Sequence, residues 1–150
     1  MEIQCIQPGD ELWLRTTEYA RGCSWRAGKY LAAEMENCHF TEWERVFVAT
    51  QQDEIAGYCT VSKKDCIPNV AYSPYISFVF VGENHRGRRL SKRMIDCACR
   101  YLDGLGFETV YLVSGEKGLY EKYGFVRIDE RKSLEGHREQ IFQKTLDWTE

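Results

Sequence analysis

The stretch YISFVFVGENHRGRRLSKRMIDCACRYLDGLG, residues 75–106, joins a continuous apolar run to an amphipathic run through a basic turn. The first part is almost entirely aromatic or β-branched, which predicts a strand that is buried on both faces. From residue 90 the apolar side chains repeat with helical spacing, at Leu90, Met94, Ile95, Ala98, Tyr101, Leu102 and Leu105. Another apolar run, TVYLV at 109–113, follows two glycines. A strand–helix–strand unit of this kind predicts a right-handed crossover between two parallel strands.

The segments on either side of this unit predict antiparallel strands and two further helices. Apolar and polar residues alternate in EIQCIQP, and the β-rich runs RVFVAT and IAGYCTV flank a short polar linker, as in a hairpin. In chain order the patterns predict a strand in 2–8, two helices in 10–38, a hairpin in 45–61, the strand–helix–strand unit, a short helix at 116–124, and strands at 125–129 and 138–146. We therefore expect a single α/β domain of the α+β type over residues 1–150. Its mixed sheet should have about seven strands, with a central parallel pair and helices on both faces.

Composition places the chain among globular proteins. Hydrophobic residues make up 43% and charged residues 29% of the chain. No run approaches the ~18 apolar residues of a membrane helix, and the N-terminus lacks a basic-then-apolar signal pattern, so we expect a cytoplasmic protein with no membrane partner. The seven cysteines are scattered without a Cys-x-x-Cys pair, and the three histidines lie far apart, which predicts that the protein binds no metal.

The turn between the buried strand and the helix carries a concentrated positive charge. Arg86, Arg88, Arg89, Lys92 and Arg93 lie within eight positions of a chain whose net charge is −3. The first turn of a helix already presents unpaired N–H groups and the positive end of its dipole, so these cations destabilise it unless an anion binds between them. An anion of several charges explains the cluster, and a solvated basic helix end is the alternative.

Two other classes of site fit this turn poorly. A P-loop requires Gly-x-x-x-x-Gly-Lys-Ser/Thr, but GENHRGRR has Arg88 in place of the lysine and Arg89 in place of the hydroxyl residue. Nucleic-acid binding favours a wide basic face on a basic domain, whereas this chain is acidic overall. We therefore expect no nucleic-acid partner.

The turn Arg86-Gly87-Arg88-Arg89-Leu90-Ser91 and the run GLYEKYGF at 118–125 together resemble two signatures of the GNAT superfamily, the acyl-CoA-dependent N-acyltransferases. The first signature is Gln/Arg-x-x-Gly-x-Gly/Ala, so Arg89 replaces the middle glycine and Ser91 replaces the final small residue. The resemblance covers the whole chain and implies a GNAT-like fold with acetyl-CoA as cosubstrate. The residues that it implies for coenzyme A binding are Phe80, Val81, Arg86, Gly87, Arg88, Arg89, Leu90 and Ser91. We expect Arg89 to lie in the first turn of the helix, with its side chain directed outward.

The same resemblance implies direct transfer of the acetyl group to a primary amine, with Tyr120 as the acid that protonates the departing thiolate. The alternative role for Tyr120 is core packing, because the chain has nine tyrosines. No base is evident, since the strand at 75–81 contains no acidic residue. The candidates that stay open are Glu83, Glu34, Glu36, and a water relayed through Tyr75 or Ser77.

The acceptor and the assembly are open at this point. Either a small molecule or a peptide fits as the source of the amine, and the residues that could line an aromatic acceptor pocket are Trp25, Tyr30, Trp43, Tyr72 and Tyr75. Both a monomer and a homodimer are compatible with the resemblance. The alternative function is a non-catalytic module that binds or senses acyl-CoA, because Arg89 departs from the motif and the central strand lacks an acid.

Overall fold

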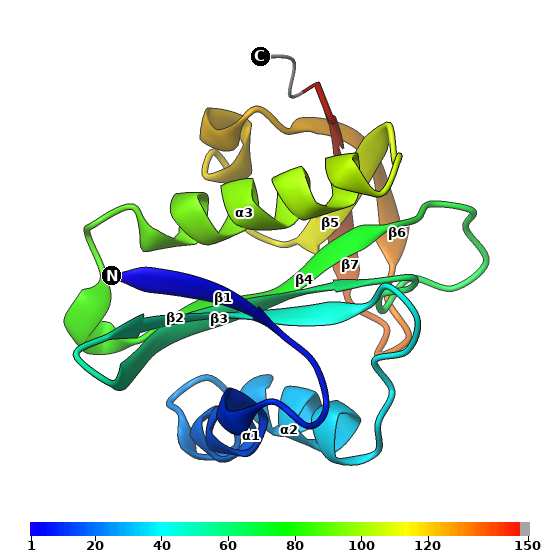
Figure 1. The fold of residues 1–150 in the computed structure, drawn as a ribbon. Helices are drawn as coiled ribbons and strands as arrows, with labels where there is room; N and C mark the ends of the chain where they lie inside the picture. Colours follow the sequence, from blue (N-terminus) through cyan, green and yellow to red (C-terminus); the bar gives the residue numbers. More distant parts are fainter. Residues whose placement is uncertain (148–150) are drawn as a thin grey trace.

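A seven-stranded mixed sheet, in the order β1-β2-β3-β4-β5-β7-β6, forms the middle layer of the computed structural model, which describes residues 1–147. Helix α3 covers one face of the sheet, and α1 and α2 lie side by side against the other (Figure 1). The elements are β1 (Glu2–Ile6), α1 (Glu11–Gly22), α2 (Gly28–Glu36), β2 (Arg45–Gln51), β3 (Glu54–Ser62), β4 (Tyr75–Val81), η1 (Glu83–His85), α3 (Leu90–Gly104), β5 (Thr109–Ser114), η2 (Tyr120–Tyr123), β6 (Val126–Lys132) and β7 (Arg138–Thr145). The mixed sheet, the parallel β4–β5 pair and the helices on both faces confirm the predicted fold.

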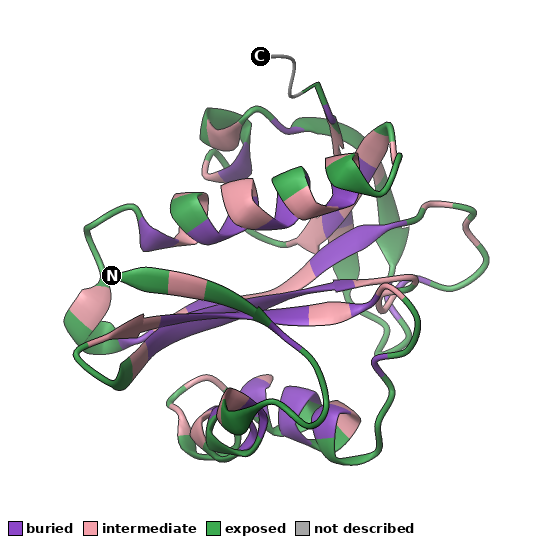
Figure 2. Cartoon of the chain, in the orientation of Figure 1, coloured by how far each residue is buried: buried purple, intermediate pink, exposed green. Residues whose placement is uncertain are grey.

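Alternation along the strands divides the core between the two faces of the sheet. In β2, Val46 and Val48 pack with α1 and α2, whereas Phe47 and Ala49 pack under α3. Successive side chains of a strand point to opposite faces, so one strand contributes to both cores. Figure 2 shows the buried residues concentrated in the central strands, while the edge strand β6 is exposed along nearly all of its length.

Helix α3 carries the apolar stripe that its sequence predicts. Its buried residues are Leu90, Met94, Ile95, Ala98, Cys99 and Leu102. Tyr101 is partly buried, and its hydroxyl donates a hydrogen bond of 2.7 Å to the Trp43 carbonyl. Leu105, predicted to continue the stripe, is 49% exposed because the helix ends at Gly104. No helix within residues 1–147 combines the length and the apolar character that crossing a membrane requires.

The parallel strands β4 and β5 stay together only at one end. Tyr75 pairs with Tyr111, and no further pair joins the two strands within the described residues. Beyond this point β4 continues along β3, and β5 continues along β7. A register shift between Tyr58 and Thr60 of β3, opposite a positive φ of 51° at Phe78 of β4, marks a bulge, and bulges bend the strand that carries them. The sheet therefore opens between the carboxyl ends of its two parallel strands.

The segment after β5 differs from its prediction. The sequence predicts a helix over 116–124, but only the single 3₁₀ turn η2 forms. Gly118 and Gly124, which flank η2, have φ of 85° and 93°. Residues in the left-handed conformation end a helix. The prediction of a longer helix is therefore wrong, because these two glycines limit the helical segment to one turn. Tyr120 nevertheless lies on a helical turn that follows the second parallel strand.

Arg89 does not occupy the first turn of α3, and this expectation is also wrong. It is the N-cap residue, with φ of 57° and ψ of 29°, and α3 begins at Leu90. This left-handed conformation costs a residue other than glycine roughly 1–2 kcal/mol, because its Cβ approaches the backbone carbonyl. Gly87, two residues earlier, has φ of 81° and avoids that cost. A glycine at the position of Arg89, as in the motif that the turn resembles, therefore has a conformational reason.

Replacing Arg89 with glycine should remove this strain. A glycine also increases the entropy of the unfolded chain, so the matched control is Arg88→Gly, at a neighbouring exposed arginine whose φ is not positive. We expect Arg89→Gly to be more stable than Arg88→Gly by about 1–2 kcal/mol in urea unfolding. Equal free energies of unfolding for the two variants would show that the backbone at Arg89 is not strained.

Candidate active site

The opening between β4 and β5 continues into one cleft of about 1990 Å³. One wall is the part of β4 from Ile76 to Val81, and another is formed by residues 112–116 at the end of β5. Residues 24–27 between α1 and α2, and the turn before α3, complete this part of the lining. Single-ligand pockets usually measure roughly 300–1,000 Å³, so this cleft has room for two ligands at once.

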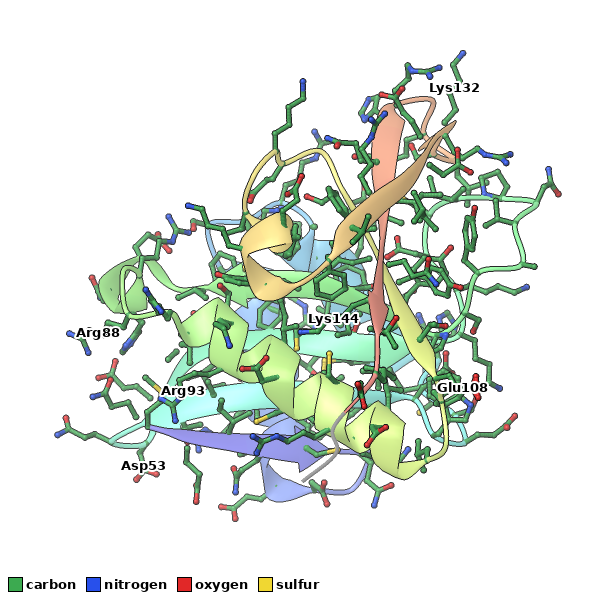
Figure 3. All side chains as sticks on the ribbon, turned by 90° about the horizontal axis from the view of Figure 1, so that it is seen from above. Asp53, Arg88, Arg93, Glu108, Lys132 and Lys144 are labelled. Atoms are coloured by element: carbon green, nitrogen blue, oxygen red, sulfur yellow. The ribbon has the colours of Figure 1, made fainter. Side chains whose placement is uncertain are left out.

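Seven of the eight residues predicted to bind coenzyme A line this cleft. They are Phe80, Val81, Arg86, Gly87, Arg89, Leu90 and Ser91. The eighth, Arg88, is exposed outside the lining, and its side chain points away from the body of the protein (Figure 3). The structure thus brings the end of β4 and the start of α3 together. We call the lining residues between 85 and 91 the basic end of the cleft.

The backbone amides at the start of α3 are available to an anion. Within the described part of the chain no side chain caps this helix, and its first turn contains no acidic residue. The first N–H groups of a helix have no partner inside the helix and carry the positive end of its dipole. The basic end therefore offers backbone donors and arginine charges in one place.

Arg86 is held against the end of β4. Its Nε donates a hydrogen bond of 3.0 Å to the Val81 carbonyl, and its guanidinium lies 5.8 Å from the centroid of the Phe80 ring. The ion pair with Glu83 is long, at 4.0 Å, and joins two exposed side chains, so it contributes little. Since a guanidinium has five N–H donors, Arg86 keeps most of them for a ligand while the strand fixes its position.

Tyr120 lies between the core and the cleft. It is 7% exposed, its ring packs edge to face with those of Tyr123 and Phe125, and it lines the cleft. Burial, reinforced by the nearby Glu116 carboxylate, raises the pKa of the Tyr120 hydroxyl well above its ordinary value. Core packing and cleft lining, which are alternatives in the sequence, both describe its position.

Ser91 connects the basic end to η2. Its hydroxyl lies 2.8 Å from the Tyr123 hydroxyl, and the Tyr123 carbonyl accepts a hydrogen bond of 2.7 Å from the Lys144 ammonium. Tyr123 also lines the cleft, although the sequence analysis did not single it out. The available signal is its place in the run GLYEKYGF, one helical turn after Tyr120.

Aromatic side chains also form part of the cleft lining. Of the residues predicted for an aromatic acceptor pocket, Trp25 and Tyr30 line the cleft. The ring of Trp25 stacks on that of Phe80 with a centroid distance of 5.8 Å and an interplanar angle of 3°. The predicted residues that lie outside the lining are Trp43, Tyr72 and Tyr75.

The candidate bases differ in position. Glu34 and Ser77 line the cleft, whereas Glu36 forms an ion pair with Arg21, and Glu83 is exposed outside the lining. Burial raises the pKa of Glu34, the nearby His39 lowers it, and the carboxylates of Asp65 and Glu44 raise it further. Asp65 also lines the cleft. It lies in an irregular loop after β3, where the sequence offers no pattern that could have identified it.

The cysteines and histidines form no separate centre. All seven cysteines are free, and burial raises the pKa of Cys99 to about 12, so this thiol stays protonated and unreactive at neutral pH. Among residues 1–147, no three His, Cys, Asp or Glu side chains come together in a way that could hold a metal ion.

Comparisons with known proteins bear on the family. The sequence model of the acetyltransferase (GNAT) family matches residues 10–125, while a search of curated proteins finds no matching sequence. The fold is similar to that of an aminoglycoside 6′-acetyltransferase type Ii, with a TM-score of 0.78 and 18% identity over 100% of both chains. An aminoglycoside 6′-N-acetyltransferase from Enterococcus faecium has a TM-score of 0.71 and 17% identity, over 100% of this chain and 99% of that chain.

A third similar structure is a GNAT family acetyltransferase from Elizabethkingia anophelis with acetyl-CoA bound, with a TM-score of 0.66 and 15% identity over 97% of each chain. At such low identities these structures establish a shared fold. The family model goes further because it spans more than half of the sequence and both motifs of the cleft. The chain therefore belongs to the acetyltransferase (GNAT) family and is an acetyltransferase.

Proposed function

We propose that the protein transfers an acetyl group from acetyl-CoA directly to a primary amine of an acceptor that binds in the same cleft. The observation that carries this proposal is the course of the cleft. It runs from the uncapped, arginine-rich start of α3, past Tyr120 and the separated strands, to a polar region lined by carboxylates. A phosphate-rich thioester and a cationic amine would thus enter from opposite ends and meet at β4.

The basic end suits the phosphates of coenzyme A. The first amides of α3 can donate hydrogen bonds to an anion, and Arg86 and Arg89 add charge-assisted contacts. Arg88 stays a predicted ligand by its place in the motif, with a side chain that lies outside the cleft lining (Figure 3). The similar protein from Elizabethkingia anophelis, which was solved with acetyl-CoA bound, supports this assignment.

The transfer needs a base, an acid and a site for the charge that develops on the thioester oxygen. The acceptor enters as an ammonium, so it first gives one proton to solvent through a water beside Ser77, and the neutral nitrogen then attacks. As the C–N bond forms and the C–S bond breaks, the backbone N–H groups of Phe80 and Val81 stabilise that oxygen in this proposal. Tyr120 gives its proton to the departing thiolate and is restored by the proton that the amine loses. Burial keeps the Tyr120 hydroxyl protonated at neutral pH, so the acid is available for each turnover.

The acceptor in this proposal is a small molecule. Two of the similar structures carry the description aminoglycoside acetyltransferase, which supports a small amine rather than a peptide. Membership of an acetyltransferase family, together with a tyrosine in the cleft at the position expected for the acid, supports turnover rather than sensing. The cytoplasmic location, the single domain and the monomeric or homodimeric state stay predictions.

Acetyl-CoA should raise the melting temperature of the protein, because a ligand that binds only the native state stabilises it. Arg86→Glu should weaken the affinity measured by calorimetry roughly ten- to a hundredfold, since it places a negative charge beside the phosphates. Arg93→Glu is the control, because it makes the same charge change on an exposed part of α3 outside the cleft lining (Figure 3). The proposed binding would be refuted if neither acetyl-CoA nor CoA changed the melting temperature of the parent protein or gave a binding signal in calorimetry.

Tyr120→Phe should separate catalysis from binding. The substitution keeps the ring in the core and removes the proton donor, so acetyl-CoA affinity should stay within a few-fold of the parent. Turnover, measured as thiol release, should fall by roughly ten- to a thousandfold, the scale of losing one general acid. Tyr101→Phe, in the same core but outside the cleft, should retain turnover. Equal activity of Tyr120→Phe and the parent would return Tyr120 to a purely structural role.

The pH dependence of turnover tests the same group. A general acid must be protonated, so its contribution to the rate is lost as pH rises through its pKa. Burial raises the pKa of Tyr120. With saturating amine, kcat should therefore not fall between about pH 7 and pH 10, because the raised pKa keeps Tyr120 protonated even near pH ~10, where an ordinary tyrosine is half ionised. A decline that begins near pH ~8 would assign protonation of the thiolate to a different group.

A further inference from the structure

The charges that line the cleft differ in sign between its two ends. The basic end contributes Arg86 and Arg89. Away from it, the lining contains Arg26, two lysines (Lys63 and Lys64) and six carboxylates. Of these, Glu116 lies near Tyr120, and the other five are Glu34, Glu44, Asp65, Glu135 and Glu139. The Lys63 ammonium is already paired with Glu42, outside the lining, at 2.7 Å. We call the region of these five carboxylates the acidic end.

Hydrogen bonds join the segments that supply the acidic end. Glu44 accepts a hydrogen bond of 2.8 Å from the Lys63 N–H, which ties the start of β2 to the end of β3. The Leu134 N–H donates to the Cys66 carbonyl at 2.8 Å, which ties the connection between β6 and β7 to the loop after β3. The acidic end is therefore a fixed part of the fold.

Asp65 is attached to the central strand through Ser77. One carboxylate oxygen of Asp65 accepts the hydroxyl proton of Ser77, and the other accepts the Cys66 N–H. Ser77 lines the cleft on β4, directly before the bulged Phe78. Because the serine donates its single proton to Asp65, its oxygen presents only acceptor lone pairs to a ligand, and the carboxylate keeps further acceptor positions. Both groups can thus receive hydrogen bonds from one ammonium.

Glu34 differs from its neighbour Glu36 on the same helix. Glu36 is exposed and forms an ion pair with Arg21. Glu34 is half-buried, and within residues 1–147 its carboxylate forms no ion pair with a lysine or arginine. The ionisable groups near it are His39, which lowers the pKa of Glu34, and the carboxylates of Asp65 and Glu44, which raise it. A half-buried carboxylate that faces other carboxylates is destabilised unless a cation compensates it.

A buried hydroxyl beside Asp65 also lacks a partner. Tyr75 is 1% exposed, and its hydroxyl makes no hydrogen bond within the described residues. Asp65 and Cys66 are the ionisable groups that affect it most. A buried hydroxyl without a partner is destabilising. Because Tyr75 lies outside the cleft lining, its hydroxyl belongs to the core behind Asp65 and is not part of the acceptor site.

We propose that the acidic end binds a small-molecule acceptor with at least two ammonium groups, of which Asp65 and Ser77 hold the amine that is acetylated and Glu34 binds a second cation. This inference rests on the proposed acetyl transfer and adds the substrate class. Ser77 lies on the strand whose carboxyl end leads to the basic end, so an amine held there faces the thioester. Glu34 lines the same cleft from α2. A second ammonium group on the acceptor, away from the nitrogen that reacts, would bind there.

The test uses α,ω-diaminoalkanes of increasing length, each compared with the monoaminoalkane of the same length. Acetylation is followed by thiol release, and acetyl-CoA affinity is measured separately by calorimetry. A diamine of fitting length should exceed its monoamine in kcat/KM by roughly tenfold or more, because its second ammonium forms a partly desolvated charge pair with Glu34.

Two charge-neutralising variants on α2 distinguish the second cation site from a general effect of charge. The diamine preference is the ratio of kcat/KM for a diamine to kcat/KM for the monoamine of the same length. Glu34→Gln should bring this ratio close to one, whereas Glu36→Gln should leave it as in the parent. Asp65→Asn should lower kcat/KM for diamines and monoamines alike, because it acts on the nitrogen that reacts.

Equal kcat/KM for diamines and monoamines would overturn the inference, and so would a diamine preference that survives Glu34→Gln. If none of these amines reacts or binds while acetyl-CoA binds normally, the acidic end is not a diamine site and the cosubstrate assignment stands. A protein that does not bind acetyl-CoA would instead refute the proposed function on which the inference rests.

Discussion

The separation of β4 from β5 is the constraint on which the rest of the structure depends. The two strands pair at Tyr75 and Tyr111 and then part, so the second half of β4 loses its parallel partner on one side. Backbone N–H and C=O groups tolerate this only where a ligand or water reaches them, and the cleft lies along that stretch. Pairing of β4 with β3 and of β5 with β7 keeps the rest of the sheet intact, so the opening is local.

The charge and strain at the start of α3 follow from the same opening. Arginines near a helix N-terminus are destabilising in isolation, and Arg89 adds a left-handed backbone. Both costs fall at the mouth of the cleft, where a polyanionic ligand would supply the opposing charge. In a chain of net charge −3, arginines at one end of the cleft and carboxylates at the other also create a field along it. In the proposed reaction, such a field would orient two substrates of opposite charge before they touch.

Sequence predicted the parts of this protein whose signals are local. Alternation in β1, the β-rich runs of the β2–β3 hairpin, the stripe of α3 and the clustered arginines are each visible within a few residues, and the fold and the basic end follow from them. The contact between Asp65 and Ser77 joins a patternless loop to a strand, so only the folded chain reveals it. The left-handed Arg89 was equally hidden, because side-chain identity favours a helical arginine and tertiary placement overrides it. The prediction of a longer helix over 116–124 was avoidable, since Gly118 and Gly124 flank the observed turn η2 in the sequence.

Tyr120 shows that packing and chemistry are not competing explanations in this cleft. Its ring packs against Phe125 and Phe142, and the burial that fixes the ring also disfavours the phenolate and so raises the pKa. In the proposed transfer, such a place suits Tyr120 as the group that delivers a proton near neutral pH. The opposite wall has the reverse character, because Asp65 and Ser77 present acceptors that suit an ammonium. In the proposed transfer, a neutral donor on the β5 side and acceptors on the β4 side would give the polarity that a proton needs to pass from an amine to a sulfur.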